Sequence, residues 1–129
     1  MLPGPLHAGA KCNAATAERA DAALDHLDNW DSLELMHRRY ANCEDGDISE
    51  GISEAIARLL VDHWHSLHNF NALVQRHPTL LDFVTAHLNS TLNTGDLEQV
   101  VQFSKGACPS RYRQLCRRLG KAAKQALSE

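Results

Sequence analysis

Apolar side chains recur at intervals of three and four residues through the middle of this chain, which is the spacing that lines one face of an α-helix. The stripe starts soon after Glu44-Asp45-Gly46, a run that is typical of a break between helices. It predicts one long central helix over residues 48–76. The members of the stripe are Ile56, Leu60, Trp64, Leu67, Phe70 and Val74.

Helix-forming residues dominate the rest of the sequence, and no long alternation of β-branched and polar residues indicates a strand. Turn signals at His77-Pro78, Asn93-Thr94-Gly95 and Cys108-Pro109 divide the chain that follows the central helix. We therefore predict an all-α, single-domain helical bundle of five or six helices around the central one. The other helices are expected over residues 13–28, 31–43, 78–88, 94–105 and 109–127.

The length of 129 residues is the usual size of one domain, which we expect residues 13–129 to form. Residues 1–12 contain two prolines and two glycines and are interpreted as a flexible N-terminal segment. No apolar run is long enough to span a membrane, and the N-terminal segment lacks the apolar core of a signal peptide. These patterns predict a cytoplasmic protein.

The four cysteines are Cys12, Cys43, Cys108 and Cys116, and no two of them form a C-x-x-C pair. Without a secretion signal, reduced thiols are expected. If one helix held Cys108 and Cys116, they would lie about 12 Å apart along its axis. A disulfide needs Cα atoms within about 7 Å. The spacing therefore predicts no bridge between these two and favours a buried thiol at Cys116.

Charge is segregated along the chain. Between Glu18 and Asp62 there are twelve acidic and four basic residues, whereas from Lys105 onward seven basic residues face only Glu129. The net charge of -3 therefore combines an acidic body with a basic tail. Each region can bias which partners approach the protein.

The acidic excess forms a stripe on the first predicted helix, where carboxylates recur at three- and four-residue spacing beside the apolar face. Such a stripe can bind a basic surface of a partner protein, or the basic helix of a second copy in a homodimer. Asp31-Ser-Leu-Glu34 also resembles a capping box, so a helix is expected to open there. The predicted partner-binding residues are Glu18, Asp21, Asp25, Asp28, Asp31 and Glu34.

The last predicted helix carries its cations on the side opposite its apolar residues. This arrangement is typical of a phosphate-contacting stripe that binds DNA or RNA. It is also the pattern of a packed C-terminal helix whose exposed side is positive, which the helix dipole favours. The sequence leaves both interpretations open. The candidate nucleic-acid-binding residues are Arg111, Arg113, Arg117, Arg118, Lys121 and Lys124.

Carboxylates and histidines at i, i+3 spacing raise the question of a metal site. Glu34-x-x-His37 and Asp62-x-x-His65 match the pairs found in di-iron four-helix bundles. Such sites also need glutamates from two further helices, and Asp62 and His65 lie away from the apolar stripe. No metal or other cofactor is therefore predicted, and these four residues are only secondary candidates.

His63 and His87 fall on the apolar sides of their predicted helices. If those helices pack antiparallel across His77-Pro78, the two imidazoles approach each other and line one pocket. The alternative is a hydrogen-bonded histidine in the core on each helix. No hydrolase, nucleotide-binding or zinc-protease motif accompanies them, so an enzyme is not expected.

These patterns favour a small, non-enzymatic regulatory or adaptor protein that binds a partner protein through charged helical surfaces. A nucleic-acid-binding protein that uses the basic C-terminal helix is the alternative. A metal- or histidine-dependent enzyme is the third hypothesis.

Overall fold

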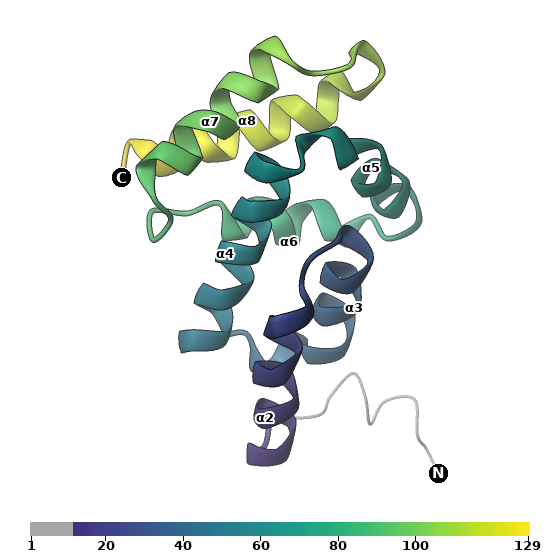
Figure 1. Ribbon diagram of the computed structural model, residues 1–129, viewed down its shortest axis with the longest axis vertical. Coiled ribbons are helices and arrows are strands. Elements are labelled where there is room, and N and C mark those ends of the chain that lie inside the picture. The colour runs from purple at the N-terminus through teal and green to yellow at the C-terminus, as the bar shows by residue number, and fades with distance from the viewer. Residues whose placement is uncertain (1–11) are drawn as a thin grey trace.

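The computed structural model describes residues 12–129, and helices are the only regular elements in that range (Figure 1). The all-α fold class predicted from the sequence is confirmed. Seven α-helices lie between Ala14 and Leu127, where five or six were expected. They are α2 (Ala14–Ala23), α3 (Trp30–Tyr40), α4 (Gly46–Asp62), α5 (Leu67–Arg76), α6 (Thr79–His87), α7 (Thr94–Gly106) and α8 (Arg113–Leu127).

The helices are distributed along the long axis of the molecule (Figure 1). α2 lies at one end beside α3, α7 and α8 form an antiparallel pair at the other end, and α4, α5 and α6 connect the two ends. Buried apolar side chains continue through all of these helices, from Ala20 in α2 to Ala126 in α8. Burial of these side chains is the main favourable contribution to folding.

The prediction of one long central helix over residues 48–76 is wrong, because the chain bends at His63 and continues as α5. His63 leaves the helical conformation (φ −133°, ψ 40°), and a short 3-10 turn follows. Two tryptophans hold the bend. The Trp64 indole donates a hydrogen bond to a backbone carbonyl of the α7–α8 loop (2.9 Å), and the Trp30 indole donates to the Ser66 hydroxyl (2.9 Å). The two groups that bond to the bend, the Ala107 carbonyl and the Trp30 indole, both lie far from it in the sequence.

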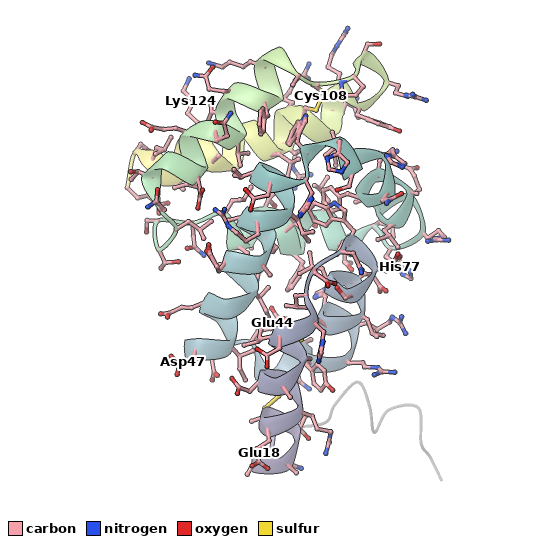
Figure 2. All side chains as sticks on the ribbon, in the orientation of Figure 1. Glu18, Glu44, Asp47, His77, Cys108 and Lys124 are labelled. Atoms are coloured by element: carbon pink, nitrogen blue, oxygen red, sulfur yellow. A yellow bond between two sulfur atoms is a disulfide. The ribbon has the colours of Figure 1, made fainter. Side chains whose placement is uncertain are left out.

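Cys108 and Cys116 form a disulfide, so the predictions of reduced thiols and of no bridge here are wrong. The separation of about 12 Å assumed a helix that continues from Cys108 to Cys116, but α8 begins only at Arg113, after a 3-10 turn at Ser110–Tyr112. Cys108 therefore lies in the loop and folds back toward α8, which brings the two Cα atoms to 6.3 Å. Figure 2 labels Cys108 at the α7–α8 end of the molecule.

A second disulfide joins Cys12 to Cys43, with Cα atoms 5.1 Å apart. It ties the chain just before α2 to the 3-10 turn Ala41–Cys43 that follows α3. Cys12 is the last residue of the segment that the sequence predicted to be flexible. The other residues of that segment, 1–11, lie outside the described part of the chain.

α3 begins earlier than predicted, and Asn29 rather than Asp31 is its N-cap. The Asn29 side-chain oxygen accepts a hydrogen bond from the Ser32 amide (2.8 Å), and the Asn29 amide donates to the Ser32 hydroxyl (3.4 Å). The capping box is therefore displaced by two residues from the predicted one. Glu34 consequently lies inside the helix, and its side chain is buried in the fold.

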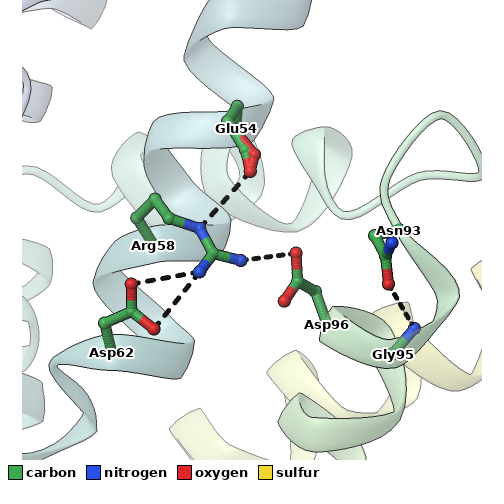
Figure 3. A network of polar contacts seen from close by, with 6 residues as sticks. All are labelled: Glu54, Arg58, Asp62, Asn93, Gly95 and Asp96. Atoms are coloured by element: carbon green, nitrogen blue, oxygen red, sulfur yellow. Dashed lines mark hydrogen bonds and ion pairs between the residues drawn. The ribbon is translucent and has the colours of Figure 1, made fainter.

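Arg58 holds α7 against α4 (Figure 3). Its guanidinium contacts Glu54 and Asp62 on α4, at 3.3 and 3.0 Å, and Asp96 in the first turn of α7, at 2.5 Å. The hydrogen bond to Asp96 raises the pKa of Arg58, so the guanidinium remains charged. This cluster fixes the position of α7 and, with it, that of the α7–α8 pair.

Candidate functional site

α8 buries one face and exposes a row of cations on another. A helix turns once every 3.6 residues, so side chains four residues apart lie on the same side. The exposed row follows this spacing at Arg113, Arg117 and Lys121, and Lys124 continues it. The buried face, which packs against the rest of the molecule, consists of Leu115, Cys116, Leu119, Ala123 and Ala126.

A surface cavity of about 520 Å³ lies between α7 and α8, and its walls are positively charged. Small or apolar residues such as Val101, Ser104 and Gly120 form part of the lining. No acidic residue is among the lining residues in the described part of the chain. We call this cavity the basic groove. Its cations are Lys105, Arg113, Arg117, Lys121 and Lys124.

Two local features fix the shape of the basic groove. Gly120 lets α8 approach α7 closely, because a Cβ atom at this position would collide with the Ser104 hydroxyl. The disulfide between Cys108 and Cys116 joins the loop at one end of the groove to the buried face of α8. A cross-linked and closely packed helix pair therefore presents the cations.

The groove cations lack acidic partners within residues 12–129, where none of the five takes part in an ion pair. Two neighbouring arginines differ from them. Arg118 pairs with Asp82 (2.7 Å), and Arg111 lies over the Tyr112 ring, 5.3 Å from its centroid. These two arginines line a second surface cavity of about 830 Å³ beside the groove. The five uncompensated charges create a positive potential that attracts anions.

The predicted acidic stripe begins on α2, at the other end of the molecule. Figure 2 places Glu18 on α2 and Lys124 on α8 at opposite ends of the long axis. The two charged surfaces therefore do not neutralise each other within one molecule. Five of the six predicted carboxylates are exposed on α2, on the segment that follows it and at the start of α3, namely Glu18, Asp21, Asp25, Asp28 and Asp31.

Glu34, the sixth residue of the predicted stripe, is buried and forms an ion pair with Arg38. Its carboxylate accepts two hydrogen bonds from the Arg38 guanidinium, at 3.0 and 3.2 Å, and His77 Nδ1 lies 3.8 Å away. The hydrogen bond from Arg38 lowers the pKa of Glu34 and outweighs the opposing effect of burial. Glu34 is therefore a charged structural residue, and a partner would meet the other five carboxylates.

His87 is buried in a polar network that joins α3, α4 and α6. Its Nδ1 lies 2.7 Å from the hydroxyl of Ser53 on α4, and its Nε2 lies 3.5 Å from one carboxylate oxygen of Glu44. The other oxygen of Glu44 lies 3.6 Å from Nδ1 of His37 on α3. The His37 ring stacks on Phe83, with 4.0 Å between centroids. One carboxylate thus bridges two histidines from different helices.

The Glu44 carboxylate is ionised in this network. Burial by itself would raise the pKa of Glu44, but the contacts with His37 and His87 lower it on balance. The order Ser53–His87–Glu44 resembles a hydrolytic triad in composition. Ser53 is only 2% exposed, however, so a substrate cannot reach its hydroxyl. The network therefore holds helices together rather than performing hydrolysis.

The sequence pattern indicates His87 as a candidate but does not indicate its two partners, Ser53 and Glu44. Ser53 lies one turn before Ile56 and Ala57 on the buried side of α4, and this position was the available signal for a buried hydroxyl. Glu44 follows α3 in a turn, where an acidic residue is ordinarily solvated. Nothing local in the sequence indicated that Glu44 would contact a histidine on α6.

His63 does not share a pocket with His87. It is exposed at the end of α4, and its ring lies 5.7 Å from that of His65 in the following turn. The predicted juxtaposition required both histidines to lie on the apolar faces of continuous helices. Because α4 ends at Asp62, His63 no longer follows the apolar face.

The four secondary metal candidates are held in separate contacts. Asp62 binds Arg58 and His65 is exposed, while Glu34 binds Arg38 and His37 faces the Glu44 carboxylate. Neither i, i+3 pair brings its two side chains to a common point with a third ligand. Within residues 12–129, no three histidine, cysteine or acidic side chains are arranged to hold a metal ion.

Comparison with models of known protein families, with curated proteins and with solved structures gives no match to this chain. None of the helices in residues 12–129 is long and apolar enough to cross a bilayer. The basic groove combines a concave shape with charge of a single sign, which is the chemistry of an anion-binding surface.

Proposed function

We propose that this protein is a small, non-enzymatic helical protein that binds the acidic surface of a partner protein through its basic groove. The observation that carries this proposal is that five cations line one cavity with no acidic residue in the lining. A helical bundle arranged around α4 keeps the groove away from the acidic end at α2. The groove is therefore available to an acidic surface from another molecule.

The expected interaction is reversible and depends on salt. An exposed ion pair contributes about 0.2–1 kcal/mol, so five of them together contribute a few kcal/mol at most. Mobile ions screen such pairs, so binding is expected to weaken as salt increases. Complementary charge also accelerates encounter and selects partners by sign, which suits a regulator or adaptor.

The two disulfides favour a protein as the partner over a nucleic acid. Disulfides persist mainly in oxidising compartments, whereas cytosolic thiols are kept reduced. They also weigh against the cytoplasmic location predicted from the sequence. We therefore expect the protein to act where its two cross-links survive, among proteins of an oxidising compartment.

A direct test uses an oligoglutamate peptide as the acidic probe, with binding measured across a salt series. The oxidised wild-type protein is expected to bind at low salt and to lose affinity as salt rises. The double variant R117A/K121A removes two groove cations and should bind about tenfold more weakly. The matched control R39A/R76A removes two exposed cations on α3 and α5. Equal losses in the two variants would contradict the groove as the binding surface.

Nucleic-acid binding is the second candidate, favoured by the length of the cationic face. Exposed cations extend along the chain from Arg111 to Lys124, well beyond the needs of a small peptide site. Affinity for duplex and single-stranded nucleic acid should then fall steeply with salt. Absence of binding at low salt would exclude this candidate and leave the protein partner.

A further inference from the structure

The acidic residues of α2 and the cations of α8 have the same spacing when the two helices are read in opposite directions. On α2 and the turn that continues it, Glu18, Asp21 and Asp25 follow at steps of three and four residues. On α8, reading from the C-terminal end, Lys124, Lys121 and Arg117 also follow at steps of three and four. Each residue rises about 1.5 Å along a helix, so the two rows match in length.

One molecule cannot bring these two rows together. α2 and α8 lie at opposite ends of the long axis (Figures 1 and 2), and both rows are exposed. Within residues 12–129, no ion pair involves Glu18, Asp21 or Asp25. The charges of both rows are therefore available to a second molecule.

The shape of α2 also suits a narrow groove. Ala14 and Ala22 are exposed on the side of the helix that carries the acidic row, and their short side chains let the helix approach closely. The disulfide between Cys12 and Cys43 ties the start of α2 to the end of α3. α2 is therefore a fixed element, and docking would not require it to fold.

We propose that the partner in the basic groove is a second copy of this chain, whose α2 docks antiparallel to α8. Glu18 then meets Lys124, Asp21 meets Lys121 and Asp25 meets Arg117. This proposal rests on the proposed function, because it names the acidic surface that the groove binds. A two-fold arrangement forms the same contact twice and closes a dimer. The antiparallel direction is also favourable for the two helix dipoles.

The test exchanges the charges of the two rows in separate variants. D21K/D25K makes the α2 row basic, and R117E/K121E makes the α8 row acidic. Either variant alone places like charges in both contacts, so its self-association should be about tenfold or more weaker than that of the wild type. Mixing the two variants restores opposite charges in both contacts of a mixed dimer. Sedimentation velocity at low salt measures the mass of the wild type, of each variant and of the mixture.

The expected result is a wild-type dimer at low salt that dissociates at high salt, a monomer for each variant, and a dimer in the mixture. R39E/R76E changes as many charges elsewhere on the surface and should dimerise like the wild type. A monomeric wild type at low salt, or a mixture that remains monomeric, would overturn the proposal. Circular dichroism spectra like the wild type's establish that the variants are folded.

Oligoglutamate binding separates this inference from the proposed function. A monomeric wild type that binds oligoglutamate through Arg117 and Lys121 refutes self-association and leaves the proposed function standing. A monomer that ignores oligoglutamate but binds nucleic acid refutes both. Dimerisation that is lost in D21K/D25K and restored when this variant is mixed with R117E/K121E supports both the proposed function and self-association.

Discussion

The Ser53 hydroxyl and Nδ1 of His87 lie 2.7 Å apart inside the protein, where both residues are almost fully shielded from solvent. The contact joins α4 to α6 across 34 residues of sequence. His87 Nε2 faces Glu44, so both ring nitrogens have partners. A polar group that is buried with its partners in place fixes the relative position of the helices that carry it.

Removal of the Ser53 hydroxyl should destabilise the fold. S53A leaves His87 Nδ1 buried without its partner, which costs about 1–3 kcal/mol of unfolding free energy. Urea denaturation of the variant and the wild type measures this difference. S90A removes an exposed hydroxyl in the α6–α7 loop and should change stability by less than about 0.5 kcal/mol. A loss in S53A no larger than that in S90A would show that the contact adds nothing.

The Glu44 carboxylate should make stability depend on acid pH. Its pKa is lower in the folded protein than its ordinary value of 4.5, through the contacts with His37 and His87 and despite burial. Its contribution is therefore complete above the unfolded value and is lost as the pH falls through the folded value. E44Q removes the charge and should cost about 1 kcal/mol at neutral pH, since contacts of 3.5 and 3.6 Å are long.

The difference in unfolding free energy between the wild type and E44Q should shrink as the pH falls. Denaturation of both proteins across a pH series measures it. Glu34, whose pKa is also lowered, remains in both proteins and gives the pH dependence that they share. A difference that stays constant down to strongly acid pH would show that the Glu44 charge is not stabilised by the histidines.

The two disulfides should contribute unequally to stability. The links span 31 and 8 residues of sequence, and a larger loop loses more entropy on cross-linking in the unfolded chain. The chain-entropy relation gives about 3.7 kcal/mol for Cys12–Cys43 and about 2.5 kcal/mol for Cys108–Cys116. Urea denaturation of C12A/C43A and C108A/C116A measures which variant loses more unfolding free energy. Thiol titration of the unreduced protein in denaturant should detect none of these four cysteines as free.

Gly120 should be intolerant of a larger side chain because α8 touches α7 there. In G120A, the added methyl group collides with the Ser104 side chain, which we expect to destabilise the protein by about 1–3 kcal/mol. The additional change S104G removes the obstructing atoms and should recover part of the loss. G106A adds a methyl group in open space near the end of α7 and is the matched control. Additive effects in G120A/S104G would show that the two positions are not in contact.

The helical character of the chain could be predicted because it depends on local spacing. α8 illustrates this best: the apolar positions Leu115 and Leu119 are buried and the cations Arg113 and Arg117 are exposed, as the helical spacing predicts. Helix ends were less predictable. Asn29 and Asp31 are both good capping residues, and the Ser32 side chain decides between them in favour of Asn29.

The parts of the candidate site that depend on distant residues could not be predicted. The bend at His63 is held by tryptophan contacts that reach 36 and 43 residues along the chain. Cys108 reaches Cys116 because the chain reverses before α8, which the assumption of one continuous helix had hidden. The Glu44 bridge between His37 and His87 has the same origin, since its three residues meet only in the folded chain.

By itself, the sequence determined that this protein is helical and that its charges fall into an acidic row on α2 and a basic row on α8, because 3.6 residues per turn assign each side chain to a face. Only the tertiary structure decided that the two rows lie at opposite ends and that Ser104, Gly120 and a disulfide shape a groove beside the basic row. Those outcomes depend on which helices pack together, and long-range packing is not encoded in the spacing of any single helix.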